Sequence, residues 1–393
     1  MKRIWYLLAC LLPLVSACHH DDEPVLLKRT VLVYIAGDNS LGANGFPDDD
    51  LAEIKQGVRE VNAGNYNLLV YFDNVGGSSG DYDRLVRINQ NGEEELIHSY
   101  PSQNSVDINV MKDVLNEAFS RYPAESYGLV LWSHGDGWMK SPSSQTRWWG
   151  QDYSGSSYMS IADLHTALAA APHLDFILFD ACFMQAVEVA YQLRDRASYI
   201  IGSPTEIPGP GAPYQTMVPA MFSAGNAESV AMATASAYYD YYQANYENLS
   251  SEWEYGASLS VVDTSQLEAL AAATASILPK YIQGGASIST SGILDYDRRA
   301  GRTDFVGYYD LDGFIRSVAS NADYQAWHKV FGNAVKYAKS TATNYSQFAG
   351  SFLMTGFAGL SSYIPRADAF AINSYYQQHV DWYSVAGWSQ TGW

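Results

Sequence analysis

The sequence predicts an α/β protein with a mainly parallel sheet that is flanked by helices on both faces, in three layers. From residue 30 to about residue 222, short and almost continuous apolar runs alternate with helix-like segments. Strands that are buried on both faces of a parallel sheet have this pattern. After about residue 223 the composition changes, and longer segments rich in Ala, Tyr and Ser predict a more helical C-terminal region.

The apolar runs of the first part are the predicted strands. They lie at Val31–Ala36, Asn67–Asp73, Arg84–Gln90, Tyr127–Ser133, Leu174–Asp180 and Tyr199–Ser203. The segments between them include helical patterns at Val106–Arg121, at Ser160–Ala171, where Ser160 and Asp163 have the spacing of a capping box, and at Phe183–Arg194. Strands that alternate with helices in this way favour parallel pairing.

The C-terminal region is predicted to open with a helix that Asn226 caps and that runs to about residue 245. A strand at Ala257–Asp263 follows, and then helices at Ser265–Tyr281 and Tyr324–Lys339. A further apolar run at Gly359–Ile364 is predicted to return as a strand to the core sheet.

The N-terminus has the features of an export signal. Lys2 and Arg3 precede the apolar stretch Ile4–Val15, which is shorter than the ~20 residues that a membrane-spanning helix needs, and Ser16 and Ala17 precede Cys18. This end resembles a bacterial lipobox, which implies cleavage before Cys18 and lipidation of its sulfur. The predicted divisions are a signal peptide at 1–17, a lipidated tether at 18–29, a core at 30–222 and the C-terminal region at 223–393. We therefore expect an exported bacterial lipoprotein at the outer membrane or cell surface.

The charge narrows the set of possible partners. The formal net charge is −19, which argues against nucleic acid and anionic membrane surfaces and is compatible with cationic substrates. We expect contact with a membrane only through the lipid anchor.

Once Cys10 leaves with the signal peptide and Cys18 is lipidated, Cys182 has no disulfide partner in the chain. A lone thiol in an exported protein is either buried and inert or kept for its reactivity.

Two motifs follow predicted strands. In LVLWSHGDGW, residues 129–138, the strand ends at Ser133, and His134 and Gly135 begin the loop. In FILFDACFMQ, residues 176–185, the strand ends at Asp180 and leads to Cys182. The helical pattern that follows predicts a thiol in the first turn of a helix, where the dipole stabilises a thiolate. Taken alone, the first motif is also compatible with a structural histidine, and the second with a cysteine that is only a small buried apolar residue.

Together the motifs are more specific. The cysteine follows the histidine by 48 residues, and each comes directly after a strand, which predicts a base and a nucleophile at the ends of neighbouring parallel strands. Here the sequence resembles the clostripain-like cysteine peptidases, which share the caspase-type fold with gingipains, legumains and separase. The resemblance extends more loosely to VLVYIAGDNSL at residue 31, SPTEIPGPGAPY at residue 203 and GLSSYIP at residue 359.

The resemblance implies a cysteine endopeptidase with a His-Cys dyad and no orienting carboxylate. Cys182 would attack the peptide, His134 would transfer the proton, and the backbone N–H groups of Gly135 and Cys182 would hold the oxyanion. Asp180, two residues before the cysteine, would lie in the pocket for the side chain before the cut bond. Cleavage after Arg and, less well, after Lys follows, because a carboxylate pairs with cations and Arg can bond both of its oxygens.

The resemblance also implies maturation by a cut between the two motifs. The segment Met139–Ser157 has no periodic pattern and predicts an exposed loop. Within it, Arg147 and then Lys140 are the candidate sites of self-cleavage, because they match the expected preference for basic residues. An uncut surface loop is the alternative.

Other functions stay open at this point. A surface lipoprotein that binds glycans or peptides without turnover would use the 14% aromatic residues as stacking platforms, and acyl transfer or amidase chemistry would use the same dyad. The segment Gly76–Gly80 matches the serine-hydrolase elbow only formally, because no helical pattern follows it. No cofactor or metal motif is present. Calcium at Asp48-Asp49-Asp50 is possible, but this run lacks the spacing of a recognised calcium loop and predicts a solvated turn.

Overall fold

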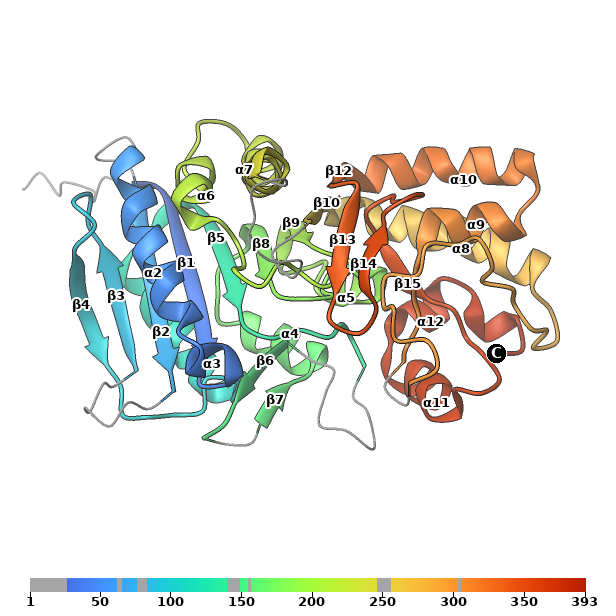
Figure 1. Cartoon of the computed structure of the whole chain (residues 1–393), viewed down its shortest axis with the longest axis horizontal. Coiled ribbons are helices and arrows are strands. Elements are labelled where there is room, and N and C mark those ends of the chain that lie inside the picture. The colour runs from blue at the N-terminus through green and yellow to red at the C-terminus, as the bar shows by residue number, and fades with distance from the viewer. Residues whose placement is uncertain are drawn as a thin grey trace, which may run out of the picture.

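The computed structural model describes residues 27–61, 66–75, 83–139, 149–154, 157–245, 256–302 and 305–393. A nine-stranded sheet forms the centre, in the order β12-β10-β9-β8-β5-β1-β2-β3-β4 (Figure 1). Its strands are β1 (Leu27–Gly37), β2 (Tyr66–Asn74), β3 (Arg84–Ile88), β4 (Glu94–Ser99), β5 (Ala124–Trp132), β8 (Leu174–Asp180), β9 (Ala197–Gly202), β10 (Ser258–Asp263) and β12 (Val335–Ser340).

Within the described ranges, three small antiparallel pairs lie outside this sheet. They are β6 (Trp149–Asp152) with β7 (Ser157–Met159), β11 (Tyr308–Asp310) with β15 (Ser361–Tyr363), and β13 (Thr343–Ser346) with β14 (Gly350–Leu353).

In the sequence, α-helices occur both before and after β9, the last strand that pairs in parallel. They are α1 (Ser40–Ala43), α2 (Phe46–Gly57), α3 (Ile108–Arg121), α4 (Ile161–Leu168), α5 (Val187–Gln192), α6 (Tyr214–Met221), α7 (Ala227–Asn245), α8 (Leu267–Tyr281), α9 (Leu311–Val318), α10 (Asn321–Ala334), α11 (Phe370–His379) and α12 (Asp381–Val385). Short 3₁₀ turns occur at Val58–Glu60, Thr264–Gln266 and Trp388–Gln390.

The sheet is parallel at its centre and antiparallel at its edges. Strands β9, β8, β5, β1 and β2 pair in parallel, whereas β3 and β4 at one edge and β10 and β12 at the other pair antiparallel. Parallel pairing requires crossover connections, and these bring helices onto the faces of the sheet. Because the central strands all run in the same direction, their carboxyl ends lie along the same end of the sheet, where loops can carry chemistry.

Each face of the sheet has its own hydrophobic core. Side chains of α2, α6 and α7 pack with one set of strand residues, and side chains of α3, α4, α5 and α8 pack with the other set. Along β1, Val31, Val33 and Ile35 belong to the first core, while Leu32 and Tyr34 belong to the second. This alternation explains why the strand is apolar at every position. The three-layer α/β prediction is confirmed, and Figure 1 shows the further helices α8 to α12 beyond the β10–β12 edge.

The edge strands differ from the predicted elements. The helix predicted at Tyr324–Lys339 ends at Ala334, and residues 335–340 form β12, which pairs with β10. Strand β4 was missed because its side chains are mostly exposed and its sequence, EELIHS, lacks an apolar run. In both cases pairing with a preformed strand outweighs the local sequence pattern.

Two more predictions are corrected. The strand predicted at Gly359–Ile364 does not join the large sheet, because β15 pairs with β11. It packs against the start of α5 instead, through a β-bridge between Ser361 and Ala186 and a hydrogen bond from the backbone N–H of Tyr363 to Glu188. The strands that return from beyond residue 222 are β10 and β12. Part of the predicted loop Met139–Ser157 is ordered as β6, where Trp149 is fully buried. No helix in the described part of the chain has the length and apolarity needed to cross a membrane.

Candidate active site

The two motifs lie on neighbouring strands in matching register. Strands β5 and β8 pair in parallel, and Trp132 at the end of β5 is opposite Asp180 at the end of β8. His134 and Cys182 each follow two residues later. The backbone of β5 and β8 therefore brings the imidazole and the thiol to the same edge of the sheet.

Gly135 lets the two loops approach each other closely. A Cβ atom on Gly135 would lie 2.6 Å from the carbonyl oxygen of Cys182 and 2.9 Å from the Cβ of Ala181. Both distances are shorter than a real Cβ atom tolerates, so any other residue here would push the histidine loop away from the cysteine loop. The glycine of the His-Gly motif is thus required by packing.

The prediction that Cys182 opens a helix is wrong. The helix α5 begins only at Val187, and Phe183 has a left-handed backbone with φ 61°. The backbone N–H of Phe183 donates to the carbonyl of Thr205, and that of Gln185 donates to the carbonyl of Ser203. These bonds hold the segment against the loop after β9, so no helix dipole acts on the thiol.

The thiol and the imidazole are both uncharged at neutral pH. Burial raises the pKa of Cys182 to about 12, and the nearby Glu206 carboxylate adds to the shift. The backbone N–H of Ile207, 3.4 Å from Sγ, opposes it only in part. Burial lowers the pKa of His134 to about 4. The resting pair is therefore a neutral thiol beside a neutral imidazole that can accept a proton.

Ser40 contacts the candidate base. Its Oγ lies 2.8 Å from Nε2 of His134, at the first residue of α1. Asn39, which precedes it, caps this helix and is itself bonded to Ser133 Oγ and to the carbonyl of Ala36. The hydroxyl is therefore held by β1 and its loop against the ring. The sequence contained no signal for this contact, because a serine after Gly-Asp-Asn is an ordinary helix start.

A cavity of about 280 Å³ contains both candidate catalytic residues. Its walls come from the first turns of α1 and α2, the ends of β5 and β8, the loop after β9 and the β13–β14 hairpin. The lining residues are Leu41, Phe46, Asp50, Trp132, Ser133, His134, Asp180, Cys182, Glu206, Ile207, Pro208, Gly209, Pro210, Gly211, Tyr345 and Gln347.

Asp180 lies in this cavity with one oxygen available. Its Oδ2 accepts hydrogen bonds from the Tyr214 hydroxyl at 2.9 Å and from the backbone N–H of Ala212 at 3.3 Å. Its Oδ1 is buried and has no hydrogen-bond partner among the described residues. Burial raises its pKa to about 6, although the two bonds to Oδ2 act in the opposite direction. A half-satisfied buried carboxylate is suited to receiving a cation.

A salt bridge from the C-terminal region braces both loops. The guanidinium of Arg299 bonds both carboxylate oxygens of Asp136, at 2.7 and 3.1 Å, two residues after His134. It also lies 5.0 Å from the centre of the Phe183 ring, next to Cys182. Arg299 therefore couples the position of the histidine loop to that of the cysteine loop, a role that sequence spacing did not reveal.

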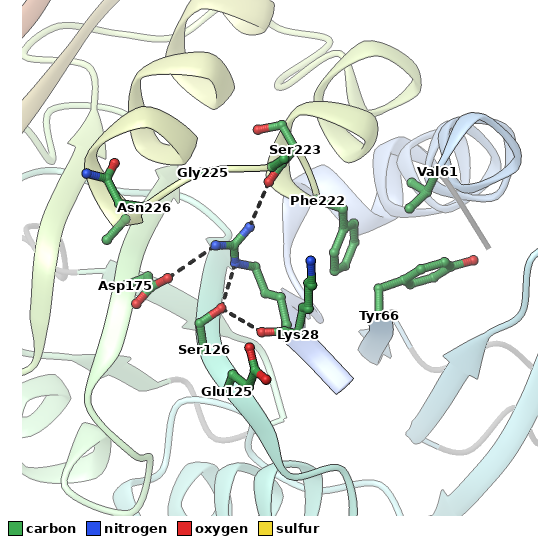
Figure 2. Close-up of a pocket in the computed structure, with 13 residues that line it drawn as sticks. Lys28, Val61, Tyr66, Glu125, Ser126, Asp175, Phe222, Ser223, Gly225 and Asn226 are labelled. Carbon is green, nitrogen blue, oxygen red and sulfur yellow. Dashed lines mark hydrogen bonds and ion pairs between the residues drawn. The ribbon is translucent and has the colours of Figure 1, made fainter. Parts of the chain in front are cut away.

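A larger cavity, about 560 Å³, lies at the amino-terminal ends of the parallel strands (Figure 2). Arg29 crosses it and donates to Ser126 Oγ, to Asp175 Oδ2 and to the carbonyls of Met221 and Ser223. These contacts tie β1, β5 and β8 to the end of α6. Among the described residues, its lining includes neither a cysteine nor a histidine, so this cavity does not hold the thiol and imidazole that the motifs predict.

Several predicted residues are not brought into the site. Cys18, Lys140 and Arg147 lie outside the described residues, as does Gly76–Gly80. Asp48 and Asp49 are exposed, but they lie at the start of the helix α2 rather than in a loop. Asp50 is buried and bonds Trp132, so the three carboxylates do not converge. Across the described ranges, no group of three or more His, Cys, Asp or Glu side chains is arranged to hold a metal ion.

Comparison with known proteins identifies relatives over nearly the whole chain. The model of the clostripain family matches residues 33–393. Clostripain from Hathewaya histolytica is 26% identical over an alignment of 218 residues, and the match covers 48% of this chain and 41% of clostripain. The match thus spans less than half of the length of that relative.

Solved structures match the fold. A secreted C11 cysteine protease from Bacteroides thetaiotaomicron, in complex with an irreversible peptide inhibitor, is 44% identical, with a TM-score of 0.81 over 92% of this chain and 99% of its own. An inactive zymogen C11 protease from Parabacteroides distasonis is 32% identical, with a TM-score of 0.77 over 93% and 99%. A cysteine protease from B. fragilis is 54% identical, with a TM-score of 0.57 over 63% and 99%.

Proposed function

Because the chain belongs to the clostripain family of cysteine peptidases, we propose that it is an exported endopeptidase that cleaves peptide bonds after Arg and, less well, after Lys. Cys182 is the nucleophile and His134 is the general base and acid. The observation that carries this proposal is the matching register of β5 and β8, which supports a thiol and a neutral imidazole in one cavity with the unpartnered oxygen of Asp180.

The chemistry follows from the neutral resting pair. The imidazole accepts the thiol proton as Sγ attacks the carbonyl carbon of the substrate, and the carbonyl oxygen gains the negative charge. The imidazolium then donates this proton to the leaving amine, the C–N bond breaks, and a thioester remains. Water, deprotonated by the same imidazole, hydrolyses the thioester and restores the thiol.

The backbone stabilises the oxyanion in this scheme. Gly135 and Cys182 are adjacent because Gly135 has no Cβ, so their N–H groups are proposed to point to a common position in the cavity. Fixed donors of this kind are worth about 3–4 kcal/mol each in a water-poor site.

Asp180 selects the substrate side chain. A guanidinium or ammonium that enters the cavity would supply the missing partner of Oδ1 and neutralise a buried carboxylate. A leucine side chain would leave that oxygen unsatisfied. The expected preference is therefore Arg over Lys and both over apolar residues.

The test is hydrolysis of fluorogenic peptides with Arg, Lys, Asp or Leu before the scissile bond, by wild type and by Cys182→Ala, with and without a chelator. We expect fast turnover of Arg peptides, slower turnover of Lys peptides and much slower turnover of Leu and Asp peptides, no turnover by the variant, and no effect of the chelator. Equal turnover of Leu and Arg peptides would exclude the Asp180 assignment, and loss of activity with chelator would indicate a calcium requirement.

Maturation and anchoring complete the proposal. We propose self-cleavage after Arg147 or Lys140. The described chain stops at Met139 and resumes at Trp149, and the side chains of Met139 and Trp149 are buried. The relative from Parabacteroides distasonis is described as an inactive zymogen, and that from Bacteroides thetaiotaomicron as secreted. We further propose that Cys18 carries the lipid anchor.

A further inference from the structure

A second buried carboxylate lines the active-site cavity and comes from a different element. Asp50 lies on α2, is 3% exposed, and is among the residues that line the cavity. Its Oδ2 accepts a hydrogen bond of 2.6 Å from Nε1 of Trp132. Trp132 is the residue opposite Asp180 in the sheet. The indole therefore fixes Asp50 relative to Asp180.

Among the described residues, the lining of the cavity has acidic side chains and no lysine or arginine to pair with them. The acidic side chains are those of Asp50, Asp180 and Glu206. Glu206 is satisfied by Ser346 Oγ and by the backbone N–H of Gln347. Burial raises the pKa of Asp50, and the carboxylate of Asp180 raises it further, so the ionised form of Asp50 is disfavoured in the empty cavity. A cation bound between the two carboxyl groups would favour the ionised form of both.

We propose that Asp50 is a second specificity-determining carboxylate, which together with Asp180 binds the guanidinium of the substrate arginine and favours arginine over lysine. This inference rests on the proposed function, because it concerns the same cavity. A guanidinium presents five N–H donors along more than one edge of a planar group, so it can bond carboxylates on two elements at once. An ammonium is a compact point charge and gains less from a second, separately placed carboxylate.

The variant Asp50→Asn tests this assignment cleanly. An asparagine keeps the shape and the acceptor oxygen for Trp132 but removes the charge. Asp49→Asn is the matched control, because Asp49 is the preceding residue of the same helix and is exposed. We expect kcat/KM for Arg peptides to fall about tenfold in Asp50→Asn, with a smaller fall for Lys peptides, and no change in Asp49→Asn. An unchanged ratio of Arg to Lys turnover would overturn the proposal.

A binding experiment separates this inference from the peptidase assignment. In a Cys182→Ala background, n-butylguanidine and n-butylamine serve as probes of the pocket, and calorimetry measures their affinities. We expect n-butylguanidine to bind more tightly, and Asp50→Asn to remove most of that difference without lowering the thermal midpoint. Dependence of binding on Asp50 without any peptide turnover would support the pocket and contradict the peptidase. Turnover of Arg peptides with no effect of Asp50→Asn on either measurement would support the peptidase and contradict the role of Asp50 in the pocket.

Discussion

Replacing Asp180 by asparagine removes one charge from the cavity and leaves its volume unchanged. The wild-type Oδ1 has no partner among the described residues, so in the substrate complex this oxygen would bond the incoming cation directly. Removing one member of a buried, hydrogen-bonded charge pair costs about 2–5 kcal/mol. At about 1.4 kcal/mol per factor of ten, kcat/KM for Arg peptides should fall at least about 30-fold, whereas slow hydrolysis of a Leu peptide should not fall.

The pH dependence gives a second measurement of the same group. The pKa of Asp180 is raised to about 6, so this carboxyl is ionised above that pH and neutral below it. For the wild type, kcat/KM with Arg peptides should drop about tenfold between pH 7 and pH 5, because only about one tenth of the carboxyl is ionised at pH 5. With Asp180→Asn the contribution of this carboxyl to the limb should disappear, leaving the titration of Asp50, whose pKa is also raised by burial, and the protonation of His134 near pH 4.

Stability provides the control for this variant. An acid whose pKa is raised by folding destabilises the folded protein as pH rises through the folded pKa, here from about 4 to about 6. Asp180→Asn should therefore unfold at no lower temperature than wild type at pH 7, measured without substrate. A lower midpoint together with equal losses for Arg and Leu peptides would refute the reasoning, because it would make Asp180 a structural residue.

Three further outcomes follow from the described contacts and the predicted motifs. Ser40→Ala should lower kcat by about 2- to 10-fold with KM unchanged, and Ser40→Thr should restore it, since one orienting hydrogen bond contributes roughly 0.5–1.5 kcal/mol; an effect on KM alone would contradict this. Purified wild type should convert into two fragments on gels, Cys182→Ala should stay intact, and Arg147→Ala should convert more slowly; equal conversion of Cys182→Ala without other proteases would disprove self-cleavage. Cys18→Ser should be released from membranes, and unchanged partitioning would show another anchor.

The buried part of the fold was predictable from the sequence because burial on both faces leaves a continuous apolar run. Strands β1, β2, β5, β8, β9 and β10 all lie within a few residues of their predicted positions. The helix start at Ser160 was also correct, since its side chain accepts from the backbone N–H of Asp163. Edge strands β4 and β12 were not predictable in this way, because exposed strands depend on pairing with neighbours that are distant in sequence.

The candidate site was predictable only where it lies on the strands themselves. His134, Cys182 and Asp180 follow apolar runs, and parallel strands place such residues at one edge. Asp50 and Arg299 lie on other elements, and only the folded chain brings them to the site. The dipole prediction for Cys182 failed for a related reason. Its helical pattern is real, but hydrogen bonds to the loop after β9 hold residues 183–185 away from helical geometry.

The charges in the cavity connect substrate choice to the reactivity of the thiol. After burial, the carboxylates of Glu206, Asp136 and Asp180 all raise the pKa of Cys182. A cation bound to Asp180 cancels part of this field and makes the thiolate less costly to form, whereas an apolar side chain does not. The preference for arginine should therefore appear in kcat as well as in KM. Steady-state comparison of Arg and Leu peptides checks this, and a difference confined to KM would show that the bound cation leaves the thiol unaffected.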